Sequence, residues 1–492
     1  MGFFVFPKYI FLNFKRSIHP IMNVIHLSAE CYPVAKAGGL GDVVSALPKY
    51  QQLAGISAIV VMPYYDRKFV QENSFDLVFQ SEITMAGTKM AFQVIKESTD
   101  KLGFPLHLIR IPGLLDRPEI YSYPDETEQF IAFQLAFLEW LGDFKQLPDV
   151  IHCHDHHTGL IPFLINHSYR YKKFSDIPTV LTIHNAQYQG WMGWDKLRYL
   201  PDVDLSKTGL LEWGTSINPL AAAVKCCWKY TTVSPSYLTE LSYNSNGLEL
   251  LFQMEQDKGS GIINGIDLDV WNPETDPMIS FNYDTENITV NKQENKKLIC
   301  AEFNLSEKKP LIAFIGRLVG EKGADLIPAA LAVSLTELKD KVSVIILGSG
   351  DRHIEHALAE LASPFKNDYS VFLGYNEALS HRIYASADFL LMPSRVEPCG
   401  LNQLYALRYG TVPVVRKTGG LIDTVIDYTE PDGYGICFEE ASAEAISGAI
   451  SRAVDLYSNT ALMRLLRNRM MSLNYSWHQS ANQYTELYNS LK

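Results

Sequence analysis

The chain has 492 residues, of which 47% are hydrophobic and 20% are charged. This composition is typical of globular proteins with large cores, and the length predicts roughly two to three domains. The net charge of −12 excludes a general nucleic-acid surface, which needs clustered Lys and Arg.

The seven cysteines are odd in number and scattered, which favours a reducing compartment over a disulfide framework. We therefore expect a cytoplasmic protein. No stretch approaches the ~18 uninterrupted apolar residues of a spanning helix, so we expect no membrane partner. In residues 1–21 the apolar run precedes the charges, whereas a signal peptide has its charges first. We expect either a disordered extension there or a wrongly chosen start, with Met22 as the natural first residue, and a weak membrane-surface anchor is the alternative.

Short apolar strands alternate with helical stretches from Asn23 onward. The first strand begins at Asn23, and a glycine-rich loop leads into a helix in which Pro48 is expected to cause a kink or a break. Further strands are predicted at 57–65, 105–113, 149–155, 178–185 and 230–237, with a helix at 128–141. This alternation predicts a parallel sheet that is covered on both faces.

The pattern then restarts in the second half of the chain. The turn-rich segment 261–277 reads as a connection. Strands are predicted beyond it at 309–318, 341–350, 370–375, 389–395 and 411–420, with helices between them. The sequence therefore predicts a second α/β unit of similar size.

One phrase occurs in both units, as KAGGLGDVV at 36–44 and as KTGGLIDTV at 417–425. Each copy follows a predicted strand and opens a helix. Ligands in open α/β sheets bind beyond the carboxyl ends of the strands. We therefore expect the two sheet edges to face each other across one interdomain cleft. Neither copy matches a dinucleotide or P-loop fingerprint, which disfavours an oxidoreductase.

Three loops carry candidate ligand groups. Lys36 and its glycines suit an anion near a helix start, although such a turn is often purely structural. Arg317 and Lys322, in IGRLVGEKG, suit a diphosphate, and a solvated loop is the alternative. Glu397, in SRVEPCGLNQLYAL, either caps a helix or faces developing positive charge.

The segment HCHDHHTGL at 152–160 combines four histidines with Asp155. Strand alternation places His152 and His154 on one face, and Cys153 and Asp155 on the other. No zinc-ligand spacing is present, so we expect no metal.

Together these motifs resemble the bacterial glycogen synthases and plant starch synthases, which are glycosyltransferases of the GT-B fold. The resemblance covers about residues 22–492 and also includes TIHNAQYQG, NGIDLDVWNPETD and the final SWHQSANQYTELYNSLK. It implies two Rossmann-like domains with an interdomain cleft, at 22–262 and 263–474. A C-terminal crossover helix, 475–492, would return to the first domain.

The implied reaction is the retaining transfer of glucose from ADP-glucose to the non-reducing end of an α-1,4-glucan, without metal or cofactor. The resemblance assigns a role to each matching position. Glu397 would offset positive charge at C1, His184 would hold the sugar, and Asp155 would lie near the acceptor hydroxyl. Arg317 and Lys322 would clamp the diphosphate. The donor would also contact Lys36, Gly39, Asn264, Tyr375 and the N–H groups of Gly400, Leu401 and Asn402.

Several positions depart from the family pattern, namely Ala37, His156, Ala221 and Asn402. They leave the diphosphate clamp intact but bear on the acceptor contacts, for which Trp191, Trp194 and Trp213 offer other stacking surfaces. Two rival functions stay open: a GT-B synthase that uses UDP-glucose, and an inactive glucan-binding homologue. Retention of Lys36, Arg317, Lys322 and Glu397 speaks against the inactive homologue.

Overall fold

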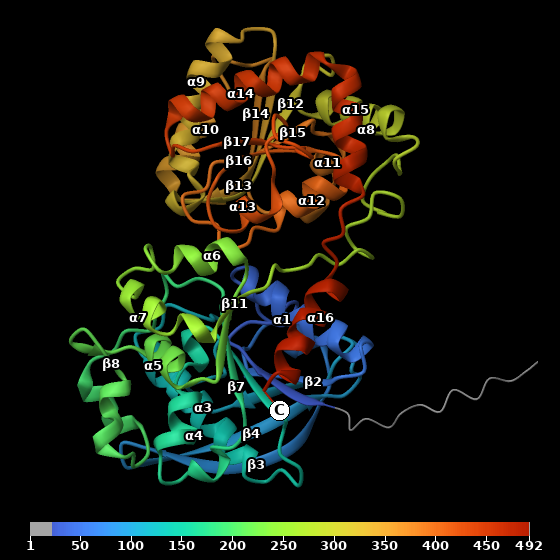
Figure 1. Ribbon diagram of the computed structural model, residues 1–492. Coiled ribbons are helices and arrows are strands. Elements are labelled where there is room, and N and C mark those ends of the chain that lie inside the picture. The colour runs from blue at the N-terminus through green and yellow to red at the C-terminus, as the bar shows by residue number, and fades with distance from the viewer. Residues whose placement is uncertain (1–21, 492) are drawn as a thin grey trace, which may run out of the picture.

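The computed structural model describes residues 22–491, which form two α/β domains stacked end to end (Figure 1). The extension predicted at 1–21 lies outside the described residues. No helix in the described part of the chain is long and apolar enough to cross a membrane. All seven cysteines are free thiols.

The first domain is built on a nine-stranded sheet in the order β11-β10-β7-β6-β1-β2-β5-β4-β3. The bounds are β1 (Asn23–Leu27), β2 (Ser57–Pro63), β3 (Phe75–Met85), β4 (Thr88–Glu97), β5 (Leu106–Arg110), β6 (Val150–His154), β7 (Thr179–Ile183), β10 (Lys229–Thr232) and β11 (Gly259–Gly261). The central strands are parallel and fully buried, because helices cover both faces. This confirms the parallel core predicted from the alternation.

An antiparallel hairpin, β3–β4, extends this sheet at one edge and was not predicted. Its turn is Ala86-Gly87, with φ of +47° and +79°, as a two-residue hairpin of the primed type requires. β3 is largely exposed, so its sequence lacks the apolar run that marks the buried strands. A small second hairpin joins β8 (Glu212–Trp213) to β9 (Ser216–Ile217).

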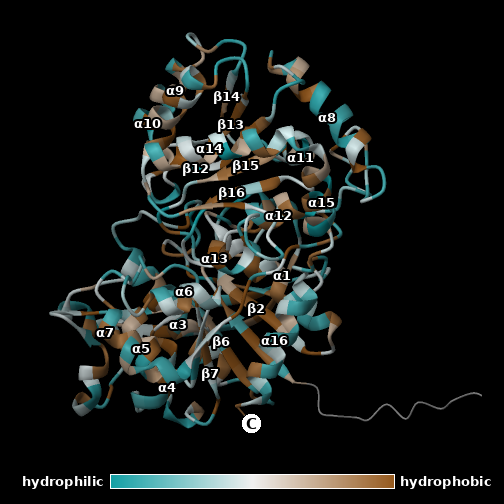
Figure 2. Cartoon of the chain, turned by 45° about the horizontal axis from the view of Figure 1, so that its top comes forward, coloured by the Kyte–Doolittle hydropathy of each residue, from teal (hydrophilic) through white to brown (hydrophobic). Residues whose placement is uncertain are grey.

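The helices of the first domain lie over the two faces of its sheet. They are α1 (Gly39–Leu53), α2 (Lys68–Glu72), α3 (Glu126–Leu141), α4 (Ile161–His167), α5 (Pro219–Cys226), α6 (Pro235–Glu240) and α7 (Glu249–Met254). Pro48 lies inside α1, which continues through it as one helix. Figure 2 shows the apolar strands β6 and β7 inside the domain, with hydrophilic residues on the outer helices.

The second domain has a six-stranded parallel sheet in the order β14-β13-β12-β15-β16-β17. Its strands are β12 (Leu311–Leu318), β13 (Ser343–Gly350), β14 (Tyr369–Leu373), β15 (Phe389–Met392), β16 (Val412–Arg416) and β17 (Ile436–Phe438). Its helices are α8 (Ile288–Glu302), α9 (Ile327–Glu337), α10 (Arg352–Glu360), α11 (Glu377–Ser386), α12 (Asn402–Arg408), α13 (Gly420–Thr424), α14 (Ala443–Ser458) and α15 (Thr460–Met471).

The last helix, α16 (Trp477–Asn489), lies against α1 of the first domain (Figure 1). Trp477, Tyr484 and Tyr488 are buried there in one cluster with Val24 and Leu47. The end of the chain therefore completes the core of the domain in which the chain begins. The exact boundaries at 262 and 474 stay predictions.

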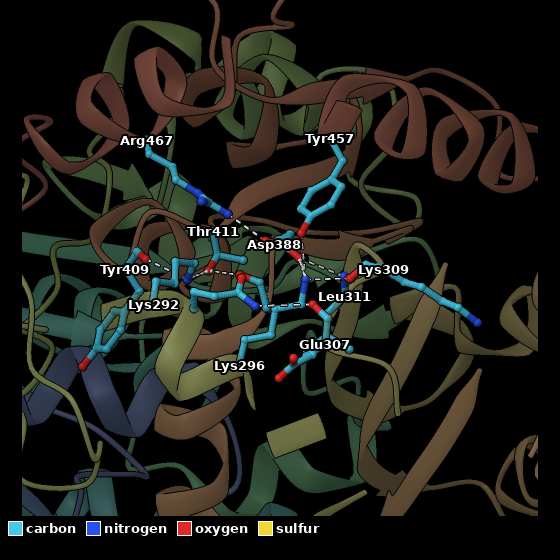
Figure 3. Close-up of polar contacts among 12 residues, drawn as sticks. Lys292, Lys296, Glu307, Lys309, Leu311, Asp388, Tyr409, Thr411, Tyr457 and Arg467 are labelled. Atoms are coloured by element: carbon cyan, nitrogen blue, oxygen red, sulfur yellow. Dashed lines mark hydrogen bonds and ion pairs between the residues drawn. The ribbon is translucent and has the colours of Figure 1, made fainter. Parts of the chain in front are cut away.

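Helix α8 is tied to the second sheet by a buried polar cluster (Figure 3). Lys296 pairs with Asp388 at 2.6 Å, and the other oxygen of Asp388 pairs with Arg467 at 2.7 Å. Burial opposes ionisation of Asp388, but the two cations hold the pKa of its carboxyl below the usual value. Lys292 donates instead to three neutral oxygens, those of Tyr384, Tyr409 and Thr411.

The second copy of the repeated phrase joins the two domains. Asp423, in α13, accepts hydrogen bonds at 2.8 Å from both the N–H and the hydroxyl of Ser236, in the first turn of α6. Glu240, at the other end of α6, accepts from the N–H of Gly419 at 3.0 Å. We expected both copies to line the cleft, and for the second copy that expectation is wrong. Its carboxylate caps a helix of the other domain.

Candidate active site

A cleft of about 1230 Å³ lies between the domains, at the carboxyl ends of β1 and β6 on one side and of β12 and β13 on the other. All twelve site residues predicted from the sequence line it: Lys36, Gly39, Asp155, His184, Asn264, Arg317, Lys322, Tyr375, Glu397, Gly400, Leu401 and Asn402. The structure thus brings them together from both domains, while their individual roles stay predictions.

Lys322 and Glu397 form the most buried ion pair of the cleft. The Lys322 ammonium lies 2.8 and 2.6 Å from the two carboxylate oxygens of Glu397. The Ser394 hydroxyl donates a further bond to Glu397 at 2.9 Å. Only 6% of the Glu397 side chain is exposed, so its charge depends on these donors.

The other two predicted cations are also paired with carboxylates of the cleft. Arg317 lies 3.3 Å from Glu321, and Lys36 lies 2.6 Å from Asp42. Both pairs are more exposed than the Lys322–Glu397 pair. Neighbouring carboxylates thus hold the cations in place on both domains. An anionic ligand that enters the cleft meets cations that are already positioned.

Asp155 and His184 lie side by side at the floor of the cleft. The Asp155 carboxylate accepts the backbone N–H of His184 at 2.7 Å. Burial raises the pKa of Asp155 to about 7, despite hydrogen bonds from two backbone N–H groups. Its backbone has a φ of +55° and a ψ of −172°, a conformation that costs a non-glycine residue energy. Strain of this kind is concentrated at functional sites.

The segment from Gly400 to Asn402 forms the start of α12. Gly400 has a φ of +76°, and a Cβ there would lie 2.3 Å from the side chain of Gln403. The Asn402 amide donates to the Ile315 carbonyl at 2.7 Å, which ties the helix start to β12. Nearby, the buried Oδ1 of Asn264 has no hydrogen-bond partner among the described residues. A ligand can therefore supply that partner.

Sequence reasoning missed Glu30 and Tyr121. Glu30 accepts the N–H groups of Ala37 and Gly38, at 2.6 and 3.0 Å, and so shapes the glycine-rich loop. The Tyr121 hydroxyl donates to its other oxygen at 2.6 Å. Glu30 lies six residues before Lys36, where the first copy of the repeated phrase begins, and this proximity was the available signal. Tyr121 lies in no recognised motif.

The histidines of β6 belong to a buried cluster. His152 and His154 stack with ring centroids 4.4 Å apart, so they share a face as predicted. Together with His26 they offer nitrogen atoms within 4.8 Å of one another, which is a geometry that a metal ion can use. Each of these nitrogens already has a hydrogen-bond partner, including Gln51, Tyr488 and Thr182.

The departures from the family pattern are accommodated locally. Ala37 binds Glu30 through its N–H, as described, and Ala221 is fully buried in α5. The ring of His156 lies 3.8 Å from that of His157. Of the tryptophans proposed as stacking surfaces, Trp191 and Trp194 are exposed, whereas Trp213 donates its indole N–H to the Gly247 carbonyl.

Two α/β domains with charged loops facing one cleft define the GT-B class of glycosyltransferases. Residues 23–254 match the starch synthase catalytic domain, and residues 295–469 match the glycosyl transferases group 1. The chain is 52% identical to a glycogen synthase of Flavobacterium johnsoniae, over 95% of this chain and 99% of that protein. A glycogen synthase of Thermodesulfovibrio yellowstonii is 38% identical, over 96% and 98% of the two chains.

Among solved structures, the catalytic domain of starch synthase IV from Arabidopsis thaliana, bound to ADP and acarbose, superimposes with a TM-score of 0.85. It is 33% identical and covers 96% of this chain and 99% of its own. A sucrose-phosphate synthase from Thermosynechococcus elongatus, 18% identical with a TM-score of 0.62, shares the fold. The chain belongs to the glycogen synthase and starch synthase family of glycosyltransferases.

Proposed function

We propose that this protein transfers glucose from ADP-glucose to the 4-hydroxyl at the non-reducing end of an α-1,4-glucan, with retention at C1. The observation that carries the proposal is the Lys322–Glu397 pair, which places a cation and an anion side by side on the cleft wall. When a sugar separates from its diphosphate, the sugar becomes positive and the diphosphate gains negative charge. The carboxylate and the ammonium of the pair offset these two charges. The ADP in the starch synthase IV complex supports an adenine nucleotide as the donor.

In the proposed reaction, the bond between C1 and the diphosphate oxygen breaks and the acceptor oxygen bonds to C1 from the same face. The acceptor proton passes to the leaving phosphate oxygen. Positive charge at C1 is offset by Glu397, and negative charge on the diphosphate is met by Lys322 and Arg317. Because these groups are held in place beforehand, they stabilise the transition state with little reorganisation.

The remaining cleft residues bind and orient the two substrates. Lys36 and Gly39 contact the donor sugar and phosphates, and the N–H groups from Gly400 to Asn402 hold phosphate oxygens. His184 and Asn264 contact the glucose, and the exposed ring of Tyr375 stacks on the base. Asp155 lies near the acceptor hydroxyl. No metal is required, since the side-chain and backbone donors of the cleft neutralise the diphosphate, and we place the enzyme in the cytoplasm.

Incorporation of labelled glucose into glycogen tests the proposal directly. ADP-glucose and UDP-glucose are compared at matched concentrations with the wild-type protein. Faster turnover of ADP-glucose is expected, and a preference for UDP-glucose would replace the assigned donor. Absence of incorporation from either donor, in protein that binds glycogen, would favour the inactive glucan-binding homologue.

A further inference from the structure

A chain of hydrogen bonds leads from the core of the first domain to the cleft. Gln51 Oε1, in α1, lies 2.7 Å from His26 Nε2, in β1. His26 Nδ1 lies 3.0 Å from His154 Nε2, in β6, and His154 Nδ1 lies 3.0 Å from His184 Nε2. The first three residues are fully buried, and His184 lines the cleft.

The direction of this chain follows from the chemistry of its first member. An amide oxygen only accepts, so the proton of a neutral His26 must lie on Nε2. Its Nδ1 is then an acceptor, which requires the proton of His154 on Nε2. His154 Nδ1 is then an acceptor too, so the proton of His184 lies on Nε2 and its Nδ1 carries no proton. In this orientation the Gln51 amide nitrogen donates to the Tyr488 hydroxyl at 3.1 Å, and that hydroxyl can donate its own proton to His152 Nδ1 at 2.7 Å.

The chain is neutral at physiological pH. Burial lowers the pKa of His26 to about 4 and that of His184 to about 3, and it lowers the pKa of His154 well below the usual value. Each ring therefore carries one proton, so all hydrogen bonds of the chain are donated in one direction, from His184 toward Gln51. His184 Nδ1 makes no hydrogen bond to any residue that the structure describes, so its lone pair is available to a ligand in the cleft.

We propose that Gln51 is a positioning residue that, through His26 and His154, fixes His184 as a hydrogen-bond acceptor for a hydroxyl of the sugar in the cleft. The proton positions rest on the hydrogen bonds of the chain and on the neutrality of its three rings, and not on the proposed function. The identity of the ligand as a donor glucose rests on the proposed function. Gln51, which is separated from the substrate by the rings of His26, His154 and His184, thus determines which groups His184 can recognise.

The proton positions are tested by NMR of the full-length protein labelled with ¹⁵N in its histidine rings, without substrate. In the wild type, His184 should carry its proton on Nε2. Gln51→Leu removes the acceptor and should release this tautomer. If Gln51→Leu does not fold, Gln51→Met replaces it. Gln52→Leu is the matched control, because within residues 22–491 the Gln52 side chain makes a hydrogen bond only to the Ala58 carbonyl. A proton on Nδ1 of His184 in the wild type would overturn the proposal.

The recognition step is tested by steady-state kinetics with ADP-glucose. Gln51→Leu should lower kcat/KM by about threefold to tenfold, the range for one hydrogen bond, whereas Gln52→Leu should stay close to wild type. With donor analogues that each lack one hydroxyl, the effect of Gln51→Leu should vanish for a single analogue. An effect of equal size with every analogue would remove the hydroxyl contact from the proposal. Lack of turnover would count against the proposed function and leave the NMR result intact.

Discussion

Lys322 donates hydrogen bonds to both carboxylate oxygens of Glu397, although the two residues lie 75 positions apart in the chain. The pair joins the loop after β12 to the loop after β15, and both strands belong to one sheet. Neither charge has another oppositely charged partner within 4.0 Å in the described residues. Removal of either residue therefore leaves the other uncompensated.

We expect Glu397→Gln and Lys322→Ala each to lower kcat by at least about 10²-fold, with a smaller change in donor binding. The reason is that both charges act mainly on charge that develops in the transition state. Asp66→Asn, at an exposed carboxylate outside the cleft, is the control and should keep its activity. Near-normal kcat in a folded Glu397→Gln variant would remove Glu397 from the mechanism.

The contact between Asp423 and Ser236 should stabilise the arrangement of the two domains. Asp423→Ala removes both acceptors from the first turn of α6, so unfolding in urea should show a loss of about 1 kcal/mol. Ser236→Ala loses only the hydroxyl bond and should cost less. The double variant should cost less than the sum of the single variants, because the residues share one interaction. If the costs of the two single variants add in full, the two residues do not interact energetically.

The buried cluster around Asp388 provides a stability prediction. Asp388→Asn leaves Lys296 and Arg467 without their shared carboxylate, which should cost about 3–5 kcal/mol of unfolding free energy. Lys297→Gln, on the exposed face of the same helix, should change it by less than about 0.5 kcal/mol. Equilibrium unfolding of both variants by circular dichroism measures the difference. Similar small losses in the two would show that the cluster contributes little.

Asp155 predicts a stability change with pH that has a definite sign. Its pKa is about 7 in the folded protein against a reference value of 3.8, so between these values the folded state binds a proton that the unfolded state releases. The contribution of Asp155 to stability is therefore present near pH 4 and is lost as pH rises through about 7.

Asp155→Asn keeps an acceptor for the His184 N–H and removes this titration. As pH rises from 3.8 to about 7, the unfolding free energy of the variant should increase relative to that of the wild type. Urea unfolding at several pH values measures this difference. Asp66→Asn should show no such trend. A flat difference between the Asp155 variant and wild type would mean that Asp155 titrates normally.

Chelation tests the histidine cluster. Because the nitrogens of His26, His152 and His154 are all engaged in hydrogen bonds, EDTA should change neither activity nor melting temperature. Loss of activity with EDTA, restored by one divalent ion, would overturn this expectation. Metal analysis of the purified protein provides a second, activity-independent measurement.

The alternation of strands and helices predicted both sheets because buried parallel strands are continuous apolar runs. It could not predict the antiparallel hairpin of β3 and β4, because β3 is largely exposed and carries no such run. The motif residues of the cleft were found because each follows a strand of known direction. What they contact was not predictable, since the pairing of Lys322 with Glu397 depends on which strands are neighbours in the sheet.

The histidine segment shows the same limit. Strand alternation placed His152 and His154 on one face, but it did not reveal that His26 and Gln51 meet them there. Those contacts depend on the pairing of β1 with β6 and on the position of α1, both set by residues far apart in sequence. Similarity between the two copies of the repeated phrase was misleading for the same reason, because Asp42 pairs with Lys36 while Asp423 reaches the other domain.

The position of α16 has a consequence for the order of synthesis on the ribosome. Val24 and Leu47 are among the first core residues to be made, but the Trp477 and Tyr484 side chains that cover them are among the last. The strands of the second domain, which end at Phe438, have all been synthesised before then. We therefore expect the first domain to keep part of its apolar surface uncovered until α16 has been made.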